Sequence, residues 1–464
     1  MLRIYNSLGR NLETFTPRDP GKVGIYLCGP TVQSEPHVGH GRSAVAFDVI
    51  RRYLMWKGLE VTLVRNITDI EDKIIQASEE SGIPVDQLAV TMAQRFSEGY
   101  SSLGVLTPDY EPKATETIVE IIMMVRTLID RGLAYEAGGD VYFAVRSMES
   151  YGKLSGRNPD DLRSGYRIEI DEAKHDPLDF ALWKAAKPNE PAWDSPWGAG
   201  RPGWHIECSA MAEKYLGRGF DIHGGGTDLI FPHHENEIAQ SEGATGELFA
   251  RYWLHNGMVN LGGEKMAKST GLLVDLATLA SKVGGRPLRF LLLRAHYRSP
   301  LEYTEALLDE AVGALERLDR FRGRASAGEP DPTVMEGFSE AMDDDFGTPQ
   351  AVSLLFDAVR DGNRLLDEGE DAAALLGAVE QIVSVLGIDE GSRPTAVDVD
   401  LSALAGQFGV FGSDLDSTVA QLISRRNVAR AERRFDEADS IRSGLEAVGI
   451  LLEDGPDGTR WLRN

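Results

Sequence analysis

Apolar and polar residues near the start of the chain follow a pattern typical of α/β folds. An apolar run over residues 23–27 predicts a strand, and residues 44–56 have the periodicity of a helix that ends before Gly58. A second apolar run, over residues 61–64, predicts the next strand. Together these elements form a βαβ unit, the building block of a parallel sheet.

The loop between the first strand and the helix contains the segment His37-Val38-Gly39-His40. Its glycine lets a ligand approach the backbone closely, and the start of the following helix carries a partial positive charge. We therefore expect this loop to bind a nucleotide phosphate. No G-x-G-x-x-G sequence follows the strand and no G-x-x-x-x-G-K-[ST] sequence occurs, which argues against dinucleotide-binding and P-loop proteins.

The α/β pattern is interrupted after the first hundred residues. Residues 114–132 predict a helix and residues 140–145 a strand. The following residues, 158–201, are rich in proline and tryptophan and predict a long loop region. This stretch has the character of an insertion.

The α/β pattern resumes at residues 220–223, where an apolar run is followed by Gly224-Gly225-Gly226 and by Asp228, a candidate for binding sugar hydroxyls. We predict an α/β protein with a Rossmann-like catalytic domain, split by an insertion and followed by an α-helical bundle and a small C-terminal domain. The expected boundaries are 1–114 and 201–250 for the two halves of the catalytic domain, 115–200 for the connective insertion, 251–310 for a connecting region, 311–395 for the bundle and 396–464 for the C-terminal domain.

Composition is that of an ordinary globular protein. The 464 residues exceed one typical domain, and 42% of them are hydrophobic and 26% charged. The apolar runs are much shorter than a membrane-spanning helix, and no apolar signal segment follows Met1-Leu2-Arg3. We therefore expect a cytoplasmic protein with no membrane partner.

The net charge of −25 is unevenly distributed. Residues 331–420 contain 19 acidic and 3 basic residues, whereas residues 421–434 contain five arginines and one acid. One interpretation of the arginines is a solvated helix face with intrahelical ion pairs. The alternative is a nucleic-acid-binding stripe formed by Arg425, Arg426, Arg430, Arg433 and Arg434.

Only two cysteines occur, Cys28 and Cys208. A disulfide is disfavoured in a long chain with the features of a cytosolic protein, whereas two unrelated buried thiols remain an alternative. His233 and Glu237 are four residues apart, so their side chains would share one face of a helix. Two thiolates, an imidazole and a carboxylate suit a four-ligand zinc site, and this combination favours a metal.

A second candidate for phosphate chemistry is the segment over residues 262–271, in which Lys265 and Lys268 stand between glycines. Two ammonium groups on one loop can stabilise the charge that develops on a polyphosphate. A solvent-exposed basic turn is the alternative for such a lysine pair.

These segments together resemble a known family. Residues 28–40 and 265–269 resemble the HIGH and KMSKS signatures of class I aminoacyl-tRNA synthetases. Similarity to the cysteinyl-tRNA synthetases lies in Cys-Gly-Pro-Thr-Val at 28–32, Asn-Ile-Thr-Asp-Ile-Glu-Asp-Lys at 66–73, Gly-Trp-His-Ile-Glu-Cys-Ser at 203–209 and Phe-Pro-His-His-Glu-Asn-Glu at 231–237. It continues through Met-Asp-Asp-Asp-Phe-Gly-Thr-Pro at 342–349 and the tail at 425–461, and so spans nearly the whole chain.

The resemblance implies a two-step enzyme. L-Cysteine and ATP would form cysteinyl-adenylate and pyrophosphate, and the cysteinyl group would then pass to the terminal ribose of tRNA-Cys. The implied cofactors are magnesium, bound with ATP, and one zinc ion that binds the substrate thiolate and so distinguishes cysteine from serine. The implied zinc ligands are Cys28, Cys208, His233 and Glu237, with His234 pointing away from them. We expect a monomer.

Other roles follow from the resemblance position by position. The ATP site would comprise His37, Gly39, His40, Gly226, Asp228, Lys265 and Lys268. Of these, His37, His40, Lys265 and Lys268 would be catalytic through positioning and charge stabilisation, without a general base. The cysteine pocket would include Gly29, Thr68 and Trp204. The five arginines would contact tRNA from an anticodon-binding domain over residues 396–464.

The chain departs from the signatures at two positions, Val38 in place of isoleucine and Ala267 in place of serine. Both lysines remain, so we expect only a modest kinetic change.

The mycothiol-pathway cysteine ligase, which joins cysteine to an amino sugar, resembles the same catalytic domain but needs no anticodon module. A non-catalytic, zinc-stabilised RNA-binding protein would not need the two histidines and two lysines. Residues 421–464 therefore favour the synthetase.

Overall fold

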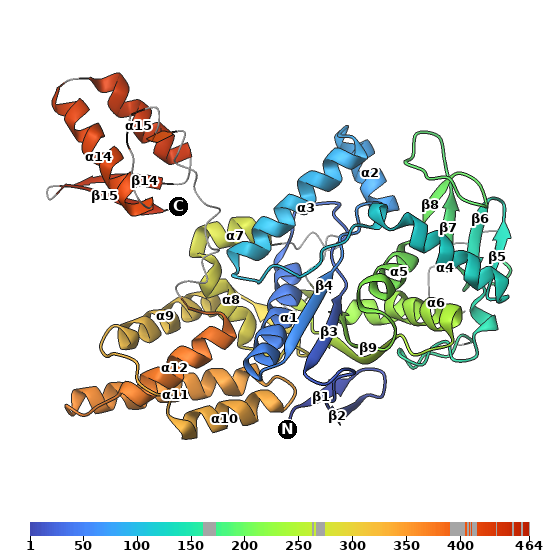
Figure 1. Ribbon diagram of the computed structural model, residues 1–464, viewed down its shortest axis with the longest axis horizontal. Coiled ribbons are helices and arrows are strands. Elements are labelled where there is room, and N and C mark those ends of the chain that lie inside the picture. Colours follow the sequence, from blue (N-terminus) through green and yellow to red (C-terminus); the bar gives the residue numbers. More distant parts are fainter. Residues whose placement is uncertain are drawn as a thin grey trace. The chain divides into compact units, whose positions relative to one another are not determined.

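The computed structural model describes most of the chain (Figure 1). The described residues are 1–160, 173–261, 264–265 as backbone, 274–389, and 404–463 with gaps at 406–407, 409, 411–414, 433, 448–449 and 456–457. They form two units, Met1–Arg393 and Pro394–Asn464. Ala267, Lys268 and Arg433 lie outside the described residues.

A four-stranded parallel sheet organises the first unit. Its strands are β3 (Lys22–Leu27), β4 (Glu60–Arg65), β9 (Phe220–Gly226) and β10 (Ala250–Asn256), in the order β10-β9-β3-β4. Helix α1 (Val38–Trp56) connects β3 to β4, as the βαβ pattern predicts (Figure 1). The predicted α/β fold class is confirmed.

Two predicted element boundaries, one of helix α1 and one of strand β9, were wrong. Helix α1 begins at Val38 rather than at residue 44, because the side chain of His37 accepts a hydrogen bond from the backbone N–H of Gly39 and caps the helix. Gly224, Gly225 and Gly226 belong to β9 itself rather than to a loop after it. A side chain at Gly224 would meet the ring of Phe47 on α1, with atoms 2.1 Å apart, so this glycine lets helix and sheet pack closely.

The residues between β4 and β9 form several helices and a separate antiparallel sheet. Helices α2 (Asp72–Ser81) and α3 (Val85–Ser102) come first, and the predicted helix over 114–132 is split into η1 (Ala114–Glu116) and α4 (Ile118–Asp130). An antiparallel sheet follows, with β5 (Ala134–Ala137), β6 (Asp140–Phe143), β7 (Phe180–Ala185) and β8 (Gly200–Pro202), and η2 (Val145–Ser147) lies after β6. This antiparallel sheet lies beside α4, α5 (Trp204–Leu216) and α6 (Glu235–Thr245) in Figure 1.

The chain then passes from the sheet into helices. A small sheet, ordered β12-β11-β13, contains β11 (Val259–Leu261), β12 (Glu264–Lys265) and β13 (Leu301–Tyr303). Helices α7 (Leu276–Val283) and α8 (Gly285–Leu293) lie between β12 and β13 in the sequence. The helical bundle consists of α9 (Glu305–Arg322), α10 (Pro332–Asp343), α11 (Thr348–Asp367) and α12 (Ala373–Leu386).

One hydrophobic core runs from the parallel sheet through α1 and α8 into the bundle. An N-terminal hairpin, β1 (Arg3–Asn6) and β2 (Asn11–Thr14), also contributes to it. The backbone N–H of Tyr5 in this hairpin donates to Asp345, which also accepts from Tyr297 and Arg298. Asp345, which follows α10, therefore fastens the bundle to the N-terminal hairpin and to the segment after α8.

The second unit contains α14 (Leu415–Ala431), α15 (Phe435–Ala447) and a hairpin of β14 (Ile450–Gly455) and β15 (Gly458–Arg463). Its core includes Val419, Leu422, Ile441 and Leu445.

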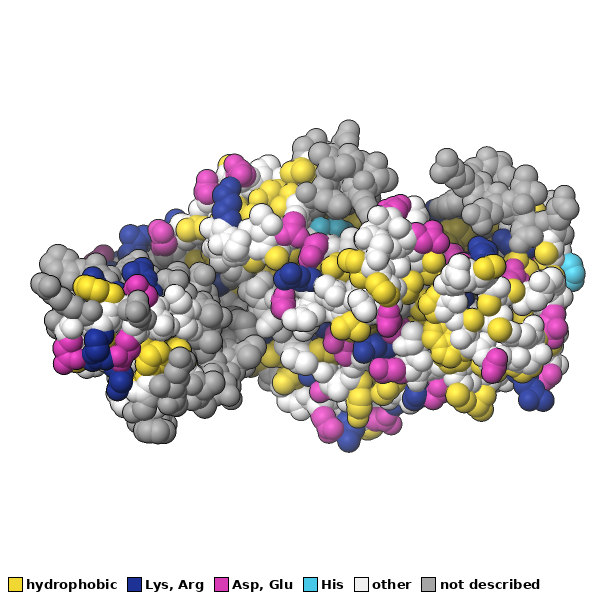
Figure 2. All heavy atoms as spheres, turned by 90° about the horizontal axis from the view of Figure 1, so that it is seen from above, with side chains coloured by type: hydrophobic (Ala, Val, Ile, Leu, Met, Phe, Trp, Pro, Cys, Tyr) yellow, Lys and Arg dark blue, Asp and Glu magenta, His cyan; other side chains and the backbone are white. Residues whose placement is uncertain are grey.

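Acidic and basic side chains are interspersed on the face of the molecule drawn in Figure 2. Among the described residues, no helix has the length and apolarity needed to cross a membrane.

Candidate active site and metal centre

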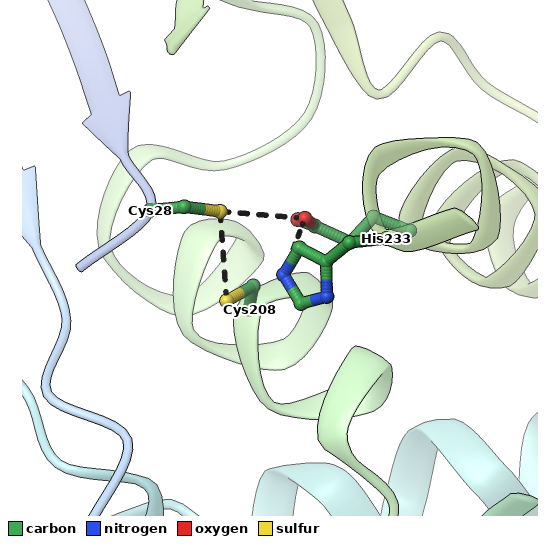
Figure 3. A group of neighbouring side chains, drawn as sticks. Cys28, Cys208 and His233 are labelled. Carbon is green, nitrogen blue, oxygen red and sulfur yellow. Dashed lines mark hydrogen bonds and ion pairs between the residues drawn. The ribbon is translucent and has the colours of Figure 1, made fainter. Parts of the chain in front are cut away.

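The four residues that the sequence suggests as metal ligands converge at the carboxyl end of β3. Cys28 follows β3, Cys208 lies on α5, His233 lies in the short π-helical segment η5 (Ile230–His234), and Glu237 lies on α6. Their potential ligand atoms are all within 4.8 Å of one another. The Sγ atoms of the two cysteines are 3.7 Å apart, and both thiols are free (Figure 3).

Glu237 connects the members of this cluster. Its Oε1 is 3.4 Å from the Sγ of Cys28 and 3.1 Å from the Nε2 of His233. Its Oε2 is 2.8 Å from the Nε2 of His223, a residue that sequence reasoning missed. His223 lies inside β9, where its spacing to the motifs carries no signal of this contact.

The cluster is buried and contains acidic groups. Burial raises the pKa of the Cys28 thiol well above its usual value, and Cys208 and Glu237 raise it further. The hydrogen bond from Cys28 lowers the pKa of Cys208, but burial and Glu237 outweigh it and leave this pKa raised. Burial lowers the pKa of His233 well below its usual value, as do His205 and His223. A divalent cation would reverse the balance at the thiols, because it stabilises thiolates.

His234 does not point away from the ligands as expected. Its Nδ1 is 2.8 Å from the Nε2 of His255, and its Nε2 is buried without a hydrogen-bond partner and lies 3.9 Å from the Oε1 of Glu237. With Cys28, His223 and Glu237 it forms a second set of potential ligands that meets the same 4.8 Å limit. The two sets share Cys28 and Glu237, so they describe one candidate metal centre with several surrounding imidazoles.

His37 and His40 lie at the start of α1 with their rings stacked 3.8 Å apart. The Nδ1 of His37 accepts from the backbone N–H of Gly39, and the Nδ1 of His40 accepts from the backbone N–H of His37. Since both Nδ1 atoms are acceptors, a neutral ring must carry its proton on Nε2. Burial lowers the pKa of His40 well below its usual value, and His37 lowers it further. The pair can therefore donate hydrogen bonds to an anion.

The lysine loop is fastened next to these histidines. The backbone N–H of Val38 donates to the carbonyl of Val274 at 3.1 Å, and that of Leu276 donates to the carbonyl of Pro36 at 2.9 Å. At the other end of the loop, Lys265 pairs with Asn260 in the small sheet. The backbone thus places residues 274–276, which follow the lysine segment in the sequence, beside the start of α1, while Lys268 lies outside the described residues.

Gly226 and Asp228 lie at the carboxyl end of β9, adjacent to β3 in the sheet. The side chain of Asp228 is exposed, and its Oδ1 lies 2.5 Å from the position that a Cβ on Gly226 would occupy. A larger residue at 226 would displace this carboxylate. The carboxyl ends of parallel strands are the usual ligand-binding edge of such sheets.

The three predicted pocket residues contact the candidate ligands or their sequence neighbours. Gly29 follows Cys28, and a Cβ on it would lie 1.6 Å from the backbone oxygen of Asn66, so only glycine fits. The ring of Trp204 lies 4.2 Å from that of His233, centroid to centroid. The hydroxyl of Thr68 donates to Glu207 at 3.1 Å. Glu207 and Asn66 were both missed as site residues, although both lie in segments that carry the family resemblance.

The arginine stripe is only partly exposed. Arg426 is 3% exposed and so does not belong to the surface of α14, whereas Arg425, Arg430 and Arg434 are exposed. Arg425 forms an ion pair with Glu437 at 2.8 Å, and Arg434 pairs with Glu432 and Glu437. Ion pairs therefore account for part of the stripe, although the pair of Arg425 joins α14 to α15 and is not intrahelical as expected.

Family models match nearly the whole chain. Residues 14–313 match the tRNA synthetases class I (C) catalytic domain, which is more than half of the chain. Residues 337–388 match the DALR domain, and residues 412–461 match the cysteinyl-tRNA ligase anticodon binding domain.

Relatives named cysteine–tRNA ligase are similar over their full length. The relative from Halorhodospira halophila is 50% identical over 467 residues, and that from Alkalilimnicola ehrlichii is 51% identical over 472 residues; each alignment covers 100% of both chains. Methionyl-tRNA synthetase of Mycobacterium tuberculosis, solved with methionyl-adenylate, has a TM-score of 0.59 at 15% identity, covering 86% of this chain and 96% of that one. The LeuRS of Agrobacterium radiobacter, in a ternary complex with tRNA and LeuAMS, has a TM-score of 0.57 at 12% identity, covering 84% of this chain and 86% of that one. At these identities the structures show a shared fold, and the family models with the full-length relatives show that the chain belongs to the cysteinyl-tRNA synthetases, within class I of the aminoacyl-tRNA synthetases.

Proposed function

We propose that this chain activates L-cysteine with ATP and transfers the cysteinyl group to the terminal ribose of tRNA-Cys. The observation that carries the proposal is the convergence of Cys28, Cys208, His233 and Glu237 within 4.8 Å at the carboxyl end of β3, beside the histidine pair that starts α1. Thiol recognition and nucleotide binding would then take place at one edge of the sheet. The full-length similarity to cysteine–tRNA ligases supports the same conclusion.

The donor set fits zinc. Two cysteine sulfurs, one imidazole and one carboxylate are ligands that zinc takes, and Cys28 is less buried than the other three. When bound, zinc would supply a soft Lewis acid that prefers the thiolate of cysteine to the hydroxyl of serine. Because such a difference in ligand chemistry discriminates better than pocket shape, we expect no need for editing.

The remaining roles belong to side chains of the chain itself. His37 and His40 would donate from Nε2 to the phosphates of ATP, and Lys265 and Lys268 would stabilise the departing pyrophosphate. Gly226 and Asp228 would face the ribose. The carboxylate of cysteine is already a nucleophile, so positioning and charge stabilisation are sufficient for the first step. Magnesium would arrive with ATP and needs no protein cage.

The second unit would bind the anticodon end of tRNA-Cys. Its exposed arginines Arg425, Arg430 and Arg434 can approach phosphates, and its match to the anticodon binding domain supports this role. The mycothiol-pathway ligase is not favoured, because the full-length relatives are cysteine–tRNA ligases. We retain the expectation of a monomer in the cytoplasm as part of this proposal.

Cysteine-dependent exchange of pyrophosphate into ATP tests the activation step. We expect exchange with cysteine but not with serine, followed by transfer to tRNA-Cys and not to an amino sugar. Lys268→Ala should slow exchange by about two orders of magnitude or more and leave cysteine binding nearly unchanged. Ala267→Ser in the same loop is the matched control and should change the rate only modestly. A small effect of Lys268→Ala would contradict its assigned role.

A further inference from the structure

A buried chain of hydrogen bonds connects the predicted cysteine pocket to a carboxyl group that the proposed mechanism does not use. The backbone N–H of Gly29 donates to the Oδ1 of Asn66 at 2.8 Å, and the Nδ2 of Asn66 donates to the Oγ1 of Thr68 at 3.3 Å. The Oγ1 of Thr68 donates in turn to the Oε2 of Glu207 at 3.1 Å. Asn66, Thr68 and Glu207 are 0%, 1% and 0% exposed, so water does not compete for these bonds.

The direction of every bond in this chain follows from its first member. The backbone N–H of Gly29 can only donate, so the amide oxygen of Asn66 must face it. The amide nitrogen of Asn66 then faces Thr68 and makes the hydroxyl of Thr68 an acceptor. The single hydrogen of that hydroxyl must therefore point to Glu207.

Thr68 is left with one unused hydrogen-bonding position. A hydroxyl has one donor and two acceptor lone pairs, and Asn66 and Glu207 occupy the donor and one lone pair. Only an acceptor remains for a third partner. An acceptor suits the α-ammonium group of an amino acid and does not suit its carboxylate.

Glu207 has a feature that a purely structural acid would not need. Its Oε1 is buried without a hydrogen-bond partner, although an unmet buried carboxyl oxygen is costly. The polarity of the chain holds when Oε2 is the unprotonated carboxyl oxygen, because Oε2 then accepts from Thr68.

We propose that Glu207 is a positioning residue that fixes the hydroxyl of Thr68 as an acceptor for the α-ammonium group of the substrate. This inference rests on the proposed function, because it takes an amino acid with a thiol as the occupant of the site. Without an acceptor at 207 the Thr68 hydroxyl could rotate and present its hydrogen to the pocket. The network would thereby recognise the end of the substrate opposite to the one held at the metal.

The proposal can be tested by measuring, with calorimetry, how tightly the zinc-loaded full chain binds three thiols. Cysteine carries both an ammonium and a carboxylate, cysteamine carries only the ammonium, and 3-mercaptopropionate carries only the carboxylate. Glu207→Gln, whose amide can turn its NH₂ toward Thr68, should weaken binding of cysteine and cysteamine by roughly tenfold or more, the usual effect of losing a hydrogen bond to a charged group. Binding of 3-mercaptopropionate should change by less than about twofold.

A double-mutant cycle separates positioning from general distortion. Thr68→Val removes the hydroxyl, and if Glu207 acts through Thr68 then Glu207→Gln should add little to it. Glu213→Gln on the same helix makes the same charge change at a residue that pairs with Arg218, and it should leave all three affinities unchanged. Zinc content should stay at one ion per chain in every variant.

Several outcomes would overturn the proposal. Equal losses for all three thiols would indicate distortion of the metal centre, and additive losses in the double variant would mean that Glu207 acts without Thr68. If Glu207→Gln does not fold, Thr68→Val alone must still discriminate between cysteamine and 3-mercaptopropionate. Absence of cysteine-dependent exchange in the unmodified chain would reject the proposed function instead, and the three binding measurements would still report on the network.

Discussion

Two buried acidic sites in this molecule are built in opposite ways. Asp48 on α1 lies against the guanidinium of Arg289 on α8, and their side chains are 1% and 0% exposed. Asp48 also accepts from Arg52 at 2.7 Å and from the backbone N–H of Leu106 at 2.8 Å. Here the chain supplies the cations that the buried carboxylate needs.

In the part of the chain that the structure describes, the cluster around Glu237 lacks such built-in cations. Among the described residues, the ion-pair partners of Glu237 are His223, His233 and His234, and burial lowers the pKa of His233 and His234 well below the usual value. A neutral imidazole does not compensate a carboxylate or a thiolate. The positive charge would therefore have to come from a bound ion.

The pKa values follow the same division. Burial alone would raise the pKa of Asp48, but Arg289 and Arg52 outweigh burial and hold this pKa below its usual value. At Cys28, burial and the neighbouring acids act in the same direction and raise the pKa. The comparison teaches that a buried acid with its own cation serves stability, whereas a cluster of buried acids without one points to ligand binding.

The largest effect that tests this comparison is expected at the metal centre. Cys208→Ser removes a sulfur ligand, so zinc affinity should fall by roughly a thousandfold or more, and the concentration of cysteine needed for exchange should rise. The free energy of unfolding of the metal-free variant should lie within about 1 kcal/mol of that of the metal-free unmodified chain, because the cluster does not stabilise the fold by itself. Metal analysis with denaturation in chelator measures both quantities. Unchanged zinc stoichiometry would refute the role of Cys208 as a ligand.

A smaller but substantial effect is expected at the Asp48–Arg289 pair. Arg289→Met leaves Asp48 buried with Arg52 as its remaining cation, and we expect a loss of about 3 kcal/mol in the free energy of unfolding. Adding Asp48→Leu should restore much of that loss, because an apolar pair of similar size needs no counter-charge. Urea denaturation of the single and double variants gives the comparison. Zinc content should stay unchanged in both, and zinc loss would show that the two sites are not independent.

Sequence reasoning recovered the parts of the molecule that depend on short-range patterns. The βαβ unit follows from apolar periodicity, and the proximity of His233 and Glu237 follows from a spacing of four residues. The start of α1 was missed because histidines form its capping box, whereas serine, threonine or aspartate usually do. The glycines of β9 were assigned to a loop because their reason for lying in a strand is the close approach of Phe47.

Contacts between distant segments could not be predicted in this way. Asp48 and Arg289 are 241 positions apart, and Thr68 and Glu207 are 139 apart. The sequence singled out Thr68 as a pocket residue, but only the fold shows that its partner is Glu207, just as it pairs Asp48 with Arg289. The burial of Arg426 is similar, because five arginines in fourteen residues suggest a surface until the packing of α14 is known.

The smallest expected effect is a difference in pH dependence. The pKa of Asp48 is lowered in the folded chain, whereas an unfolded aspartate titrates near pH 3.9, so the unfolded state binds the proton more readily. The stability that the pair contributes is therefore present above about pH 4 and is lost as the pH falls through the folded pKa. The difference in unfolding free energy between the unmodified chain and Asp48→Asn should shrink by about 1 kcal/mol between pH 5 and pH 3. Asp367→Asn, which disrupts an exposed ion pair with Arg324, is the control and should show a difference below about 0.5 kcal/mol throughout. A difference for Asp48→Asn that stays constant with pH would mean that Arg289 does not hold the carboxylate in its charged form.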